Sequence, residues 1–292
     1  MMKTTAVIVA YYPDEDVLAR LVSALVPQVE HILVVDNNSE GFDFRPIAAL
    51  SEKVSLVINQ ENLGIAAGFN QGVAFAIENG SSHVVLFDQD SLPAEDMLAK
   101  MHEVFQDAKG RGIKLAALGP NYVDVKGAGQ SPFVKVQGLR LVRVSGENRK
   151  FVSVDHLISS GCLVDLEALG VIGVFEEQLF IDYVDTEWCL RAKSKGYELY
   201  GVCEAYMKHD LGEQFLTILH KTIPVHSALR HYYLMRNGVW LIRRPWVGWR
   251  WRVIDTVRLT KILIVFSVFG KPRLEHIRSM LRGIKDGLLA KF

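Results

Sequence analysis

Cysteine is scarce in this chain, and long hydrophobic runs are absent. The three cysteines among 292 residues, Cys162, Cys189 and Cys203, lie in apolar or helical stretches and lack the spacing of a metal site. An odd number of such cysteines argues against a disulfide framework and is typical of reduced core residues in a cytosolic protein. The apolar run at residues 262–269 is shorter than the roughly 20 residues of a membrane-spanning helix. We therefore expect no transmembrane segment.

The chain also lacks net charge and a leader-like start. Lys and Arg number 33, as do Asp and Glu, but residues 230–292 hold 14 basic and 3 acidic residues, which leaves 19 and 30 for residues 1–229. The two parts therefore carry +11 and −11. A basic C-terminal part attracts an anionic partner such as a membrane surface, a lipid phosphate or nucleic acid, although a solvated basic face has the same composition. Pro13 interrupts the N-terminal apolar run and no cleavage site follows, which argues against a signal peptide.

The first half alternates short β-branched runs with helical patterns, which predicts βαβ units and a mainly parallel sheet. The predicted strands are residues 6–11, 31–35, 54–59, 83–87 and 115–118. The predicted helices are residues 14–25, 64–78, 94–109 and 185–195, the last followed by a strand at 197–202. Residues 120–155 are expected to form loops and short strands, and the chain is expected to be helical from Ile223 onward. The fold class is thus α/β, with a domain at 1–229 and a basic, amphipathic helical region at 230–292.

Polar residues follow two of the predicted strands. Asp36 follows the second strand, and Asp88-Gln89-Asp90 closes the fourth. In parallel sheets, ligands bind beyond the carboxyl ends of the strands. Residues two apart in an extended chain project to the same side, so both carboxylates of the second motif can face one cation such as Mg²⁺ or Mn²⁺ on a diphosphate. A solvated turn is the alternative.

Glycines recur every four residues at 64, 68 and 72, on one face of a predicted helix. Glycine in a helix interior costs roughly 1 kcal/mol relative to alanine, so something must approach this face closely. Tight packing on the sheet and close contact with a ligand both explain the pattern. Asn62 and Asn70, which flank it, are expected to brace the loop after the second strand or to touch a nucleotide.

Three carboxylates gather where a later helix begins. Asp182, Asp185 and Glu187 precede or start the helix at 185–195, and a carboxylate there can accept the proton of an attacking hydroxyl. A structural explanation is equally available: Asp182 as the N-cap, Asp185 in the favourable first turn and Glu187 paired with Arg191.

Further along lie a possible metal ligand and a possible anion site. His209 follows the next strand, and a neutral imidazole is a plausible third metal ligand. Arg230, Tyr233, Arg236 and Asn237 form a cluster suited to binding an acceptor phosphate, although a helix that packs on the catalytic domain accounts for it as well.

The C-terminal region has two features of a membrane-surface segment. Four tryptophans between residues 240 and 251 are interleaved with arginines, a combination that the headgroup zone favours. Apolar residues then recur at steps of three and four along one face of the last helix. These residues are Leu274, Ile277, Leu281, Ile284 and Leu288. A helix that pairs with a second subunit shows the same stripe.

Taken together and in this order, the motifs resemble glycosyltransferase family 2, which has the GT-A fold, over roughly residues 4–240. The wording Phe87-Asp-Gln-Asp-Ser91 and the segment from Phe180 to Trp188 are similar to bacterial rhamnosyltransferases that use dTDP-L-rhamnose. The resemblance implies that Asp185 is the catalytic base. It further implies nucleotide-sugar contacts and metal ligands. The nucleotide-sugar residues are Tyr11, Asp36, Asn38, Asn62, Gly64, Asn70 and Asp88, and the ligands of Mg²⁺ or Mn²⁺ are Asp88, Asp90 and His209.

The implied reaction inverts the anomeric carbon of a nucleotide sugar and transfers the sugar to a lipid-linked saccharide acceptor at the inner face of the cytoplasmic membrane. The expected partners are the donor, this acceptor, an anionic membrane surface and a possible second copy, but no nucleic acid. Alternatives are a family 2 enzyme for another donor such as a UDP-hexose, a sugar-phosphate nucleotidylyltransferase, and a non-catalytic nucleotide-binding or membrane scaffold protein. A nucleotidylyltransferase needs a Gly-rich, basic loop after the first strand, where this chain has Tyr11-Tyr12-Pro13-Asp14.

Overall fold

The computed structural model describes residues 2–124, 133–144, 146, 149–209, 215–218, 221–224 and 227–292. The chain forms two compact units. Unit 1 comprises Met1–Lys135, Val142–Glu177 and Val184–Asp210, and unit 2 comprises Val136–Leu141, Gln178–Tyr183 and Leu211–Phe292. The chain passes from unit 1 to unit 2 within β7 (Phe133–Gln137) and back within β8 (Arg140–Val144), and these two strands pair with each other.

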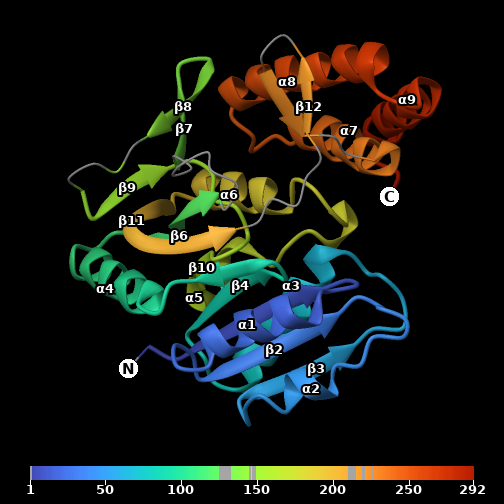
Figure 1. The fold of residues 1–292 in the computed structure, drawn as a ribbon. Coiled ribbons are helices and arrows are strands. Elements are labelled where there is room, and N and C mark those ends of the chain that lie inside the picture. Colours follow the sequence, from blue (N-terminus) through green and yellow to red (C-terminus); the bar gives the residue numbers. More distant parts are fainter. Residues whose placement is uncertain are drawn as a thin grey trace. The chain divides into compact units, whose positions relative to one another are not determined.

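Unit 1 is built on a sheet of nine strands in the described part of the chain, with the order β3-β2-β1-β4-β10-β6-β11-β5 and β9 paired to β11 (Figure 1). Strands β1 to β4, β6 and β11 run in one direction, whereas β5, β9 and β10 run against them. This mainly parallel sheet confirms the predicted α/β class. The strands are β1 (Thr4–Ala10), β2 (His31–Asp36), β3 (Val54–Ile58), β4 (His83–Asp88), β5 (Ser91–Pro93), β6 (Leu115–Asp124), β9 (Phe151–Val154), β10 (Leu163–Asp165) and β11 (Glu198–His209).

Helices cover both faces of this sheet (Figure 1). Side chains alternate along β1, so Ala6, Ile8 and Ala10 share one buried cluster with the leucines of α1 and the apolar residues of α4, while Val7 and Val9 point to α3. The Asp14 carboxylate caps α1 by accepting a hydrogen bond from the Val17 amide at 3.0 Å. The helices of this unit are α1 (Glu15–Leu25), α2 (Arg45–Ala48), α3 (Ile65–Glu78), α4 (Met97–Gly110), α5 (Leu166–Ile172) and α6 (Val184–Ser194).

The recurring glycines of α3 are explained by close packing on the sheet. A Cβ atom on Gly68 would lie 2.8 Å from a Val9 methyl carbon, and one on Gly72 would lie 2.3 Å from both methyl carbons of Val7. Gly64 stands at the start of the helix with φ of 85°, a conformation that favours glycine. Of the two explanations for the glycine pattern, the structure supports packing for positions 68 and 72.

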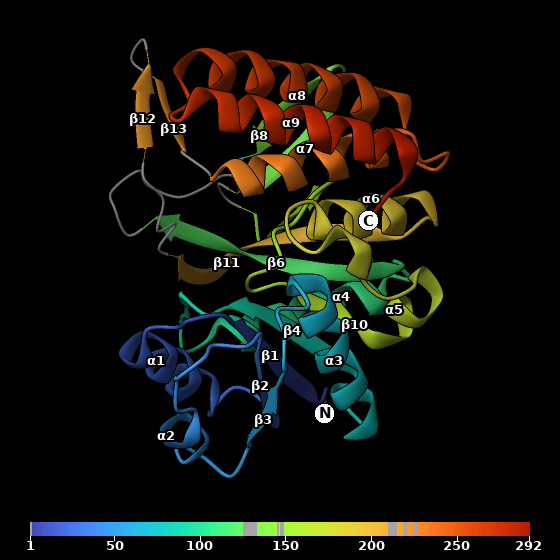
Figure 2. The same ribbon diagram turned by 90° about the vertical axis from the view of Figure 1, so that its right-hand side faces the viewer.

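Unit 2 contains a hairpin and three helices that lie side by side (Figure 2). The hairpin pairs β12 (Phe215–Ile218) with β13 (Lys221–Pro224), and the helices are α7 (Ala228–Ile242), α8 (Trp249–Phe269) and α9 (Arg273–Leu289). The prediction of helix from Ile223 onward is therefore wrong at its start. Residues 221–224 form a strand because their backbones pair with β12, and Ser227 then caps α7.

The predicted α9 stripe is only partly exposed: Ile277 and Ile284 are half-buried, and Ile284 lines a small cavity with residues of α7 and α8. The buried residues of α9 are His276, Met280, Gly283 and Gly287, and a Cβ atom on either glycine would lie 2.4 Å from a main-chain oxygen of α7. The leucines of the predicted stripe at 274, 281 and 288 are each more than half exposed. They are therefore free for contacts outside this bundle.

The tryptophans only partly fit the membrane-surface prediction. Trp240 and Trp251 are buried, so they belong to the core of unit 2, whereas Trp249 is 63% exposed. The guanidinium of Arg244 stacks on the Trp240 ring at 4.3 Å from its centroid, so part of the Trp-Arg interleaving is internal packing. Within the described residues, each helix is too short or too polar to span a bilayer.

Candidate active site

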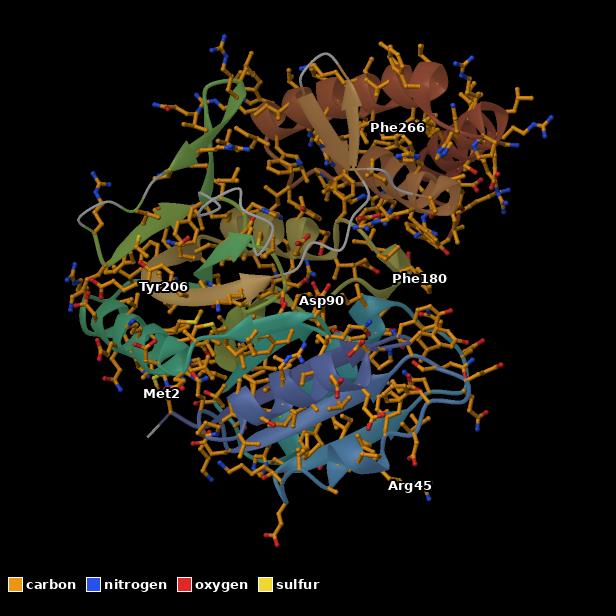
Figure 3. The ribbon with its side chains drawn as sticks, in the orientation of Figure 1. Met2, Arg45, Asp90, Phe180, Tyr206 and Phe266 are labelled. Carbon is orange, nitrogen blue, oxygen red and sulfur yellow. The ribbon has the colours of Figure 1, made fainter. Side chains whose placement is uncertain are left out.

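The candidate site lies at the carboxyl edge of the unit 1 sheet, where three strands end level with one another. The register pairs Ala10 of β1 with Asp36 of β2, and Val9 of β1 with Asp88 of β4. Tyr11 follows directly on β1 and is half exposed. Figure 3 labels Asp90, which lies in the turn after β4. The residues predicted to bind a nucleotide sugar thus start from one edge, as expected for a parallel sheet.

Asp36 is buried and organises the loop that follows it. Its carboxylate accepts hydrogen bonds from the Ser39 amide at 3.0 and 3.1 Å and from the Ser39 hydroxyl at 2.5 Å. The same hydroxyl oxygen accepts a hydrogen bond from the Tyr12 amide at 2.7 Å, which ties this loop to the end of β1. Asn38, between them, has a φ of 67°. Asp36 therefore holds the loop after β2 in place through Ser39. A direct contact of Asp36 with the nucleotide stays a prediction.

Gln89, the middle residue of the Asp88-Gln89-Asp90 motif, joins that motif to β1. The Tyr11 amide donates to the Gln89 side-chain oxygen at 2.7 Å, and the Gln89 side-chain nitrogen donates to the Tyr11 carbonyl at 3.3 Å. The rings of Tyr11 and Tyr12 meet edge to face at 4.7 Å. This half-exposed aromatic pair is a suitable surface for a nucleobase to stack on. The sequence analysis did not single out Gln89.

A turn, rather than an extended strand, connects Asp88 and Asp90. Asp88 is the last residue of β4 and Asp90 lies in the turn before β5, so the predicted alternation does not apply. One carboxylate oxygen of each is buried. The Ser160 hydroxyl accepts a hydrogen bond from the Asp88 amide at 3.1 Å and lies 2.6 Å from the Ser91 hydroxyl, which fixes the turn.

These carboxylates fit a divalent cation. The backbone register pairs His209, the last residue of β11, with Ser91, which directly follows Asp90. The His209 side chain lies outside the described residues, and no three metal-binding side chains gather among those that are described. Two carboxylates and an imidazole on a paired strand form a donor set that suits Mg²⁺ or Mn²⁺.

The asparagines around the α3 glycines brace backbone. The Asn62 oxygen accepts from the Gly64 amide at 3.0 Å, and the Asn37 side chain donates to the Gly64 carbonyl at 3.1 Å, so Asn37 rather than Asn62 joins this turn to the β2 loop. Asn70 exchanges hydrogen bonds with the Phe175 main chain at 2.9 and 3.0 Å and donates to the Glu177 carboxylate at 2.8 Å. These bonds engage the Asn70 amide away from the β2 loop, which corrects the expectation that it braces that loop.

Asp185 lies at the start of α6 beside an unexpected partner, His156. The Asp185 carboxylate accepts from the Thr186 amide at 2.6 Å, and its nearer oxygen lies 3.7 Å from His156 Nε2. Burial alone would raise the pKa of Asp185, but the interactions with His156 and Thr186 outweigh it and lower the pKa below its usual value. A quarter of the side chain is exposed, so an ionised carboxylate is open to a substrate. No local pattern in the sequence pointed to His156.

The segment after His156 lies behind the Asp88 turn. Ser160 accepts a hydrogen bond from the Asp88 amide. Cys162, two residues further on, is buried, and burial, with a smaller effect of the Asp185 charge, raises its pKa above the usual range. All three cysteines are free and buried, as predicted.

The structural explanation for the α6 carboxylates is partly right. Glu187 is buried and pairs with Arg191 at 2.8 Å, as expected for an i,i+4 pair. The suggestion that Asp182 caps α6 is wrong, because its carboxylate accepts hydrogen bonds from Arg230 at 3.2 and 3.3 Å. Glu187 and Asp182 are thus each bonded to an arginine, whereas Asp185 contacts Thr186 and His156.

Within unit 2, the predicted acceptor cluster binds the segment Gln178–Tyr183. Asn237 is fully buried and Arg236 nearly so, and both donate to main-chain carbonyls of this segment. They therefore hold protein backbone, which corrects the expectation of direct phosphate binding by these two. Arg230 and Tyr233 are more exposed, and for them an acceptor contact stays a prediction.

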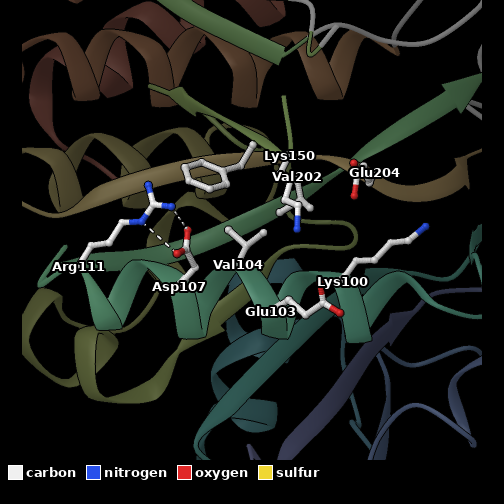
Figure 4. A pocket seen from close by; sticks show the side chains of 9 residues that line it. Lys100, Glu103, Val104, Asp107, Arg111, Lys150, Val202 and Glu204 are labelled. Atoms are coloured by element: carbon white, nitrogen blue, oxygen red, sulfur yellow. Dashed lines mark hydrogen bonds and ion pairs between the residues drawn. The ribbon is translucent and has the colours of Figure 1, made fainter. Parts of the chain in front are cut away.

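A separate cavity of about 500 Å³ opens between α4, β9 and β11 (Figure 4). None of the predicted site residues lines it. Its walls carry three basic and three acidic side chains, so it lacks the net positive charge that a diphosphate would require. These are Lys100, Arg111 and Lys150 with Glu103, Asp107 and Glu204.

The fold is that of the GT-A class. Among solved structures, the chain resembles S. aureus TarS (TM-score 0.61, 16% identity, 99% of this chain and 49% of that one). It also resembles GalNAc-T7 crystallised with UDP, GalNAc and Mn²⁺ (TM-score 0.60, 12% identity, 93% of this chain and 58% of that one). The chain thus spans about half the length of these two proteins, and at such identities the likeness concerns the fold.

The family is shown by sequence. The model of the family described as "Glycosyl transferase family 2" matches residues 6–170 of this chain. The chain is 32% identical over 286 residues to the dTDP-rhamnosyl transferase RfbF of Shigella flexneri, which covers 97% of this chain and 94% of that one. The chain belongs to glycosyl transferase family 2 and is a glycosyltransferase.

Proposed function

We propose that this enzyme transfers L-rhamnose from dTDP-L-rhamnose to a lipid-linked saccharide, with inversion at the anomeric carbon, during synthesis of a cell-surface polysaccharide. The observation that carries the choice of donor is the similarity to a dTDP-rhamnosyl transferase, which extends over nearly the whole chain, including unit 2. A UDP-hexose donor is the alternative within the same family.

Asp185 is the proposed base. The acceptor hydroxyl oxygen forms a bond to the anomeric carbon while the bond from that carbon to the diphosphate oxygen breaks on the opposite side. The hydroxyl proton passes to the Asp185 carboxylate. The carboxylate is ionised at neutral pH, as a base must be, and its partial exposure, which leaves it open to an acceptor hydroxyl, supports this role.

The donor is proposed to lie along the carboxyl edge of the sheet. Tyr11 and Asn38, with the loop held by Asp36, are placed to contact the nucleoside, and the turn at Gly64 together with Asn62 borders the same edge. Asp88, Asp90 and His209 would hold Mg²⁺ or Mn²⁺, which when bound neutralises charge on the departing diphosphate. The protein residues then have to bind the sugar, exclude water and present Asp185.

The proposal is tested by incubating the purified enzyme with a panel of nucleotide sugars, a lipid-linked acceptor and Mg²⁺ or Mn²⁺, and by measuring the released nucleotide. dTDP-L-rhamnose should be the preferred donor. Asp185→Asn should melt like the wild type, bind the donor nucleotide normally and lose on the order of 10²- to 10⁴-fold in kcat. Preference for a UDP-hexose overturns the donor, and near-normal turnover of a stable Asp185→Asn enzyme overturns the base.

We further propose that residues 1–229 form the catalytic domain and that residues 230–292 bind the inner face of the cytoplasmic membrane. An exposed apolar stripe on α8 supports this, since residues spaced by four and seven lie on one side of a helix. Its members are Trp249, Val253, Val257, Ile264 and Val268. The exposed leucines of α9 and the +11 charge of residues 230–292 are suited to the same anionic surface.

A further inference from the structure

The segment that leads into α6 has an unusual backbone. Three of the four residues from Phe180 to Tyr183 have positive φ, namely Phe180 at 64°, Asp182 at 60° and Tyr183 at 65°. None of them is glycine, so each position is conformationally unfavourable and persists only where surrounding contacts enforce it. Such residues concentrate at functional sites. Asp185 follows Tyr183 by two residues.

Two adjacent residues of α7 hold this segment by its carbonyl groups. The Asn237 side-chain nitrogen donates to the carbonyl oxygens of Leu179, Ile181 and Asp182 at 2.8 to 3.0 Å. Arg236 donates from Nε to the Asn237 side-chain oxygen at 2.9 Å, which fixes the orientation of that amide. A second Arg236 nitrogen, Nη2, donates to the Gln178 carbonyl at 2.7 Å and to the Leu179 carbonyl at 3.1 Å.

Side chains of the segment are anchored as well. The Tyr183 hydroxyl donates to the Asp255 carboxylate at 2.7 Å and accepts from Arg258, which itself donates to Asp255 at 2.8 Å. Asp255 is buried, and burial raises the pKa of Tyr183, so the hydroxyl remains a donor. The Phe180 ring stacks on Tyr233 at 5.0 Å with 18° between the ring planes. Every anchor of this segment named here comes from α7 or α8.

We propose that Asn237 and the Tyr183-Asp255-Arg258 triad are positioning residues that set the placement of the base, Asp185, through the backbone of residues 178–183. This inference rests on the proposed role of Asp185. Only Val184 lies between Tyr183 and Asp185, so a change in the held backbone is transmitted to the start of α6. A displacement of about 1 Å at a reacting group can cost on the order of 10²-fold in rate.

Buried polar side chains cluster in unit 2, although its basic and aromatic composition is typical of a membrane-surface region. A positioning role accounts for them. A helix that served only as an anchor would not need a buried amide bonded to three carbonyls or a buried carboxylate bonded to a tyrosine and an arginine. Unsatisfied buried polar groups are costly, so such a network is retained where its geometry matters. The helical unit thus contributes to turnover as well as to location.

The test compares Tyr183→Phe with Tyr232→Phe. Both substitutions remove one hydroxyl that donates to an aspartate within unit 2, but the Tyr232 hydroxyl bonds to Asp286 of α9 at 2.9 Å and does not bond to the segment. Tyr183→Phe should melt lower than Tyr232→Phe, because it removes a donor from the buried Asp255 carboxylate, but both variants should bind the donor nucleotide with unchanged Kd. Tyr183→Phe should lose on the order of tenfold or more in kcat at an unchanged KM for the donor, whereas Tyr232→Phe should keep normal kcat.

Asn237→Asp supplies a second arm, because it keeps the shape of the side chain while replacing a donor to three carbonyls with an acceptor. It should lower kcat at least as far as Tyr183→Phe; if it does not fold, the comparison of the two tyrosine variants decides. Asp185→Asn is assayed in parallel. If Asp185→Asn is inactive and Tyr183→Phe matches Tyr232→Phe, the positioning inference is overturned while the base assignment stands. If Asp185→Asn is active, the base assignment falls first.

Discussion

At the scale of single residues, the bonding partners of each carboxylate, some adjacent and some several tens of positions away, decide what it does. Asp36, Asp182 and Asp185 all sit near the ends of elements in the sequence, yet Asp36 is occupied by Ser39 and Asp182 by Arg230. Asp185 contacts Thr186 and His156 and remains partly exposed. Of these three, Asp185 has the most exposed side chain, which leaves its carboxylate open to a substrate.

The His156 interaction predicts a change in pH dependence. A base works only when ionised, so the acidic limb of kcat/KM follows the pKa of Asp185. His156 lowers that pKa. In His156→Phe the pKa of Asp185 should rise, the base should be protonated at a higher pH, and the acidic limb should move to higher pH. Rates measured across pH with saturating metal check this.

His156→Gln provides the control, because it retains a hydrogen-bond donor without an imidazole. Its acidic limb should lie between those of the wild type and His156→Phe. An unshifted limb in His156→Phe, with the fold intact, would show that His156 does not influence the base.

At the scale of elements, packing of α3 against β1 sets the position of two site loops. The helix starts at the Gly64 turn, and the strand ends at Ala10, directly before Tyr11, so the distance between helix and strand governs both loops. Glycines at 68 and 72 allow that distance to be short.

Gly72→Ala should therefore destabilise the protein. The added Cβ would lie 2.3 Å from Val7 methyl carbons, and overpacking of this kind costs about 1 to 3 kcal/mol. Gly170→Ala in α5 meets no atom within 4 Å and should be neutral or stabilising by about 0.4 to 1 kcal/mol. Denaturant unfolding of both variants checks this, and Val7→Ala should partly rescue Gly72→Ala. Equal stability of the two single variants would contradict the packing explanation.

The elements with a strong local pattern were predicted to within a few residues, and those without one were missed. The runs at 31–35 and 83–87 became β2 and β4, each one residue longer. β10 has only three residues, too few to show alternation, and it was not predicted. Residues 223–224, the second half of β13, were predicted as helix because the hairpin partner of this strand, not its composition, fixes its conformation.

The candidate site divides in the same way. Asp36, Asp88 and Asp90 were found because they follow predicted strands, and parallel strands bring their carboxyl ends to one edge. His156 was missed because 29 positions separate it from Asp185 and no periodicity connects them. Asn237 was assigned to an acceptor phosphate because its chemistry suits one, whereas the carbonyls that it binds are visible only in the folded chain.

At the scale of the whole molecule, the basic residues behind the charge asymmetry lie on the same helices of unit 2 as exposed apolar side chains. The basic residues of α8 and α9 accompany apolar side chains that the bundle leaves uncovered, including Ile264 at 59% and Leu281 at 54% exposure. Apolar residues among cations are the composition of a helix that lies in the headgroup region of an anionic bilayer. A free basic face would carry polar residues at these positions instead.

Vesicle flotation separates the two contributions to binding. Each basic residue near an anionic surface contributes about 1 kcal/mol, so binding to vesicles that contain phosphatidylglycerol should exceed binding to pure phosphatidylcholine and should weaken with salt. The double variant Ile264→Ser with Leu281→Ser should bind both vesicle types more weakly at every salt concentration. Val171→Ser, at a 59% exposed position of unit 1, should bind like the wild type. Equal flotation with neutral and anionic vesicles at low salt would contradict an electrostatic contribution. If the double variant floats like the wild type but sediments with a lower mass, the exposed apolar residues of α8 and α9 bind a second copy of the chain instead of the membrane.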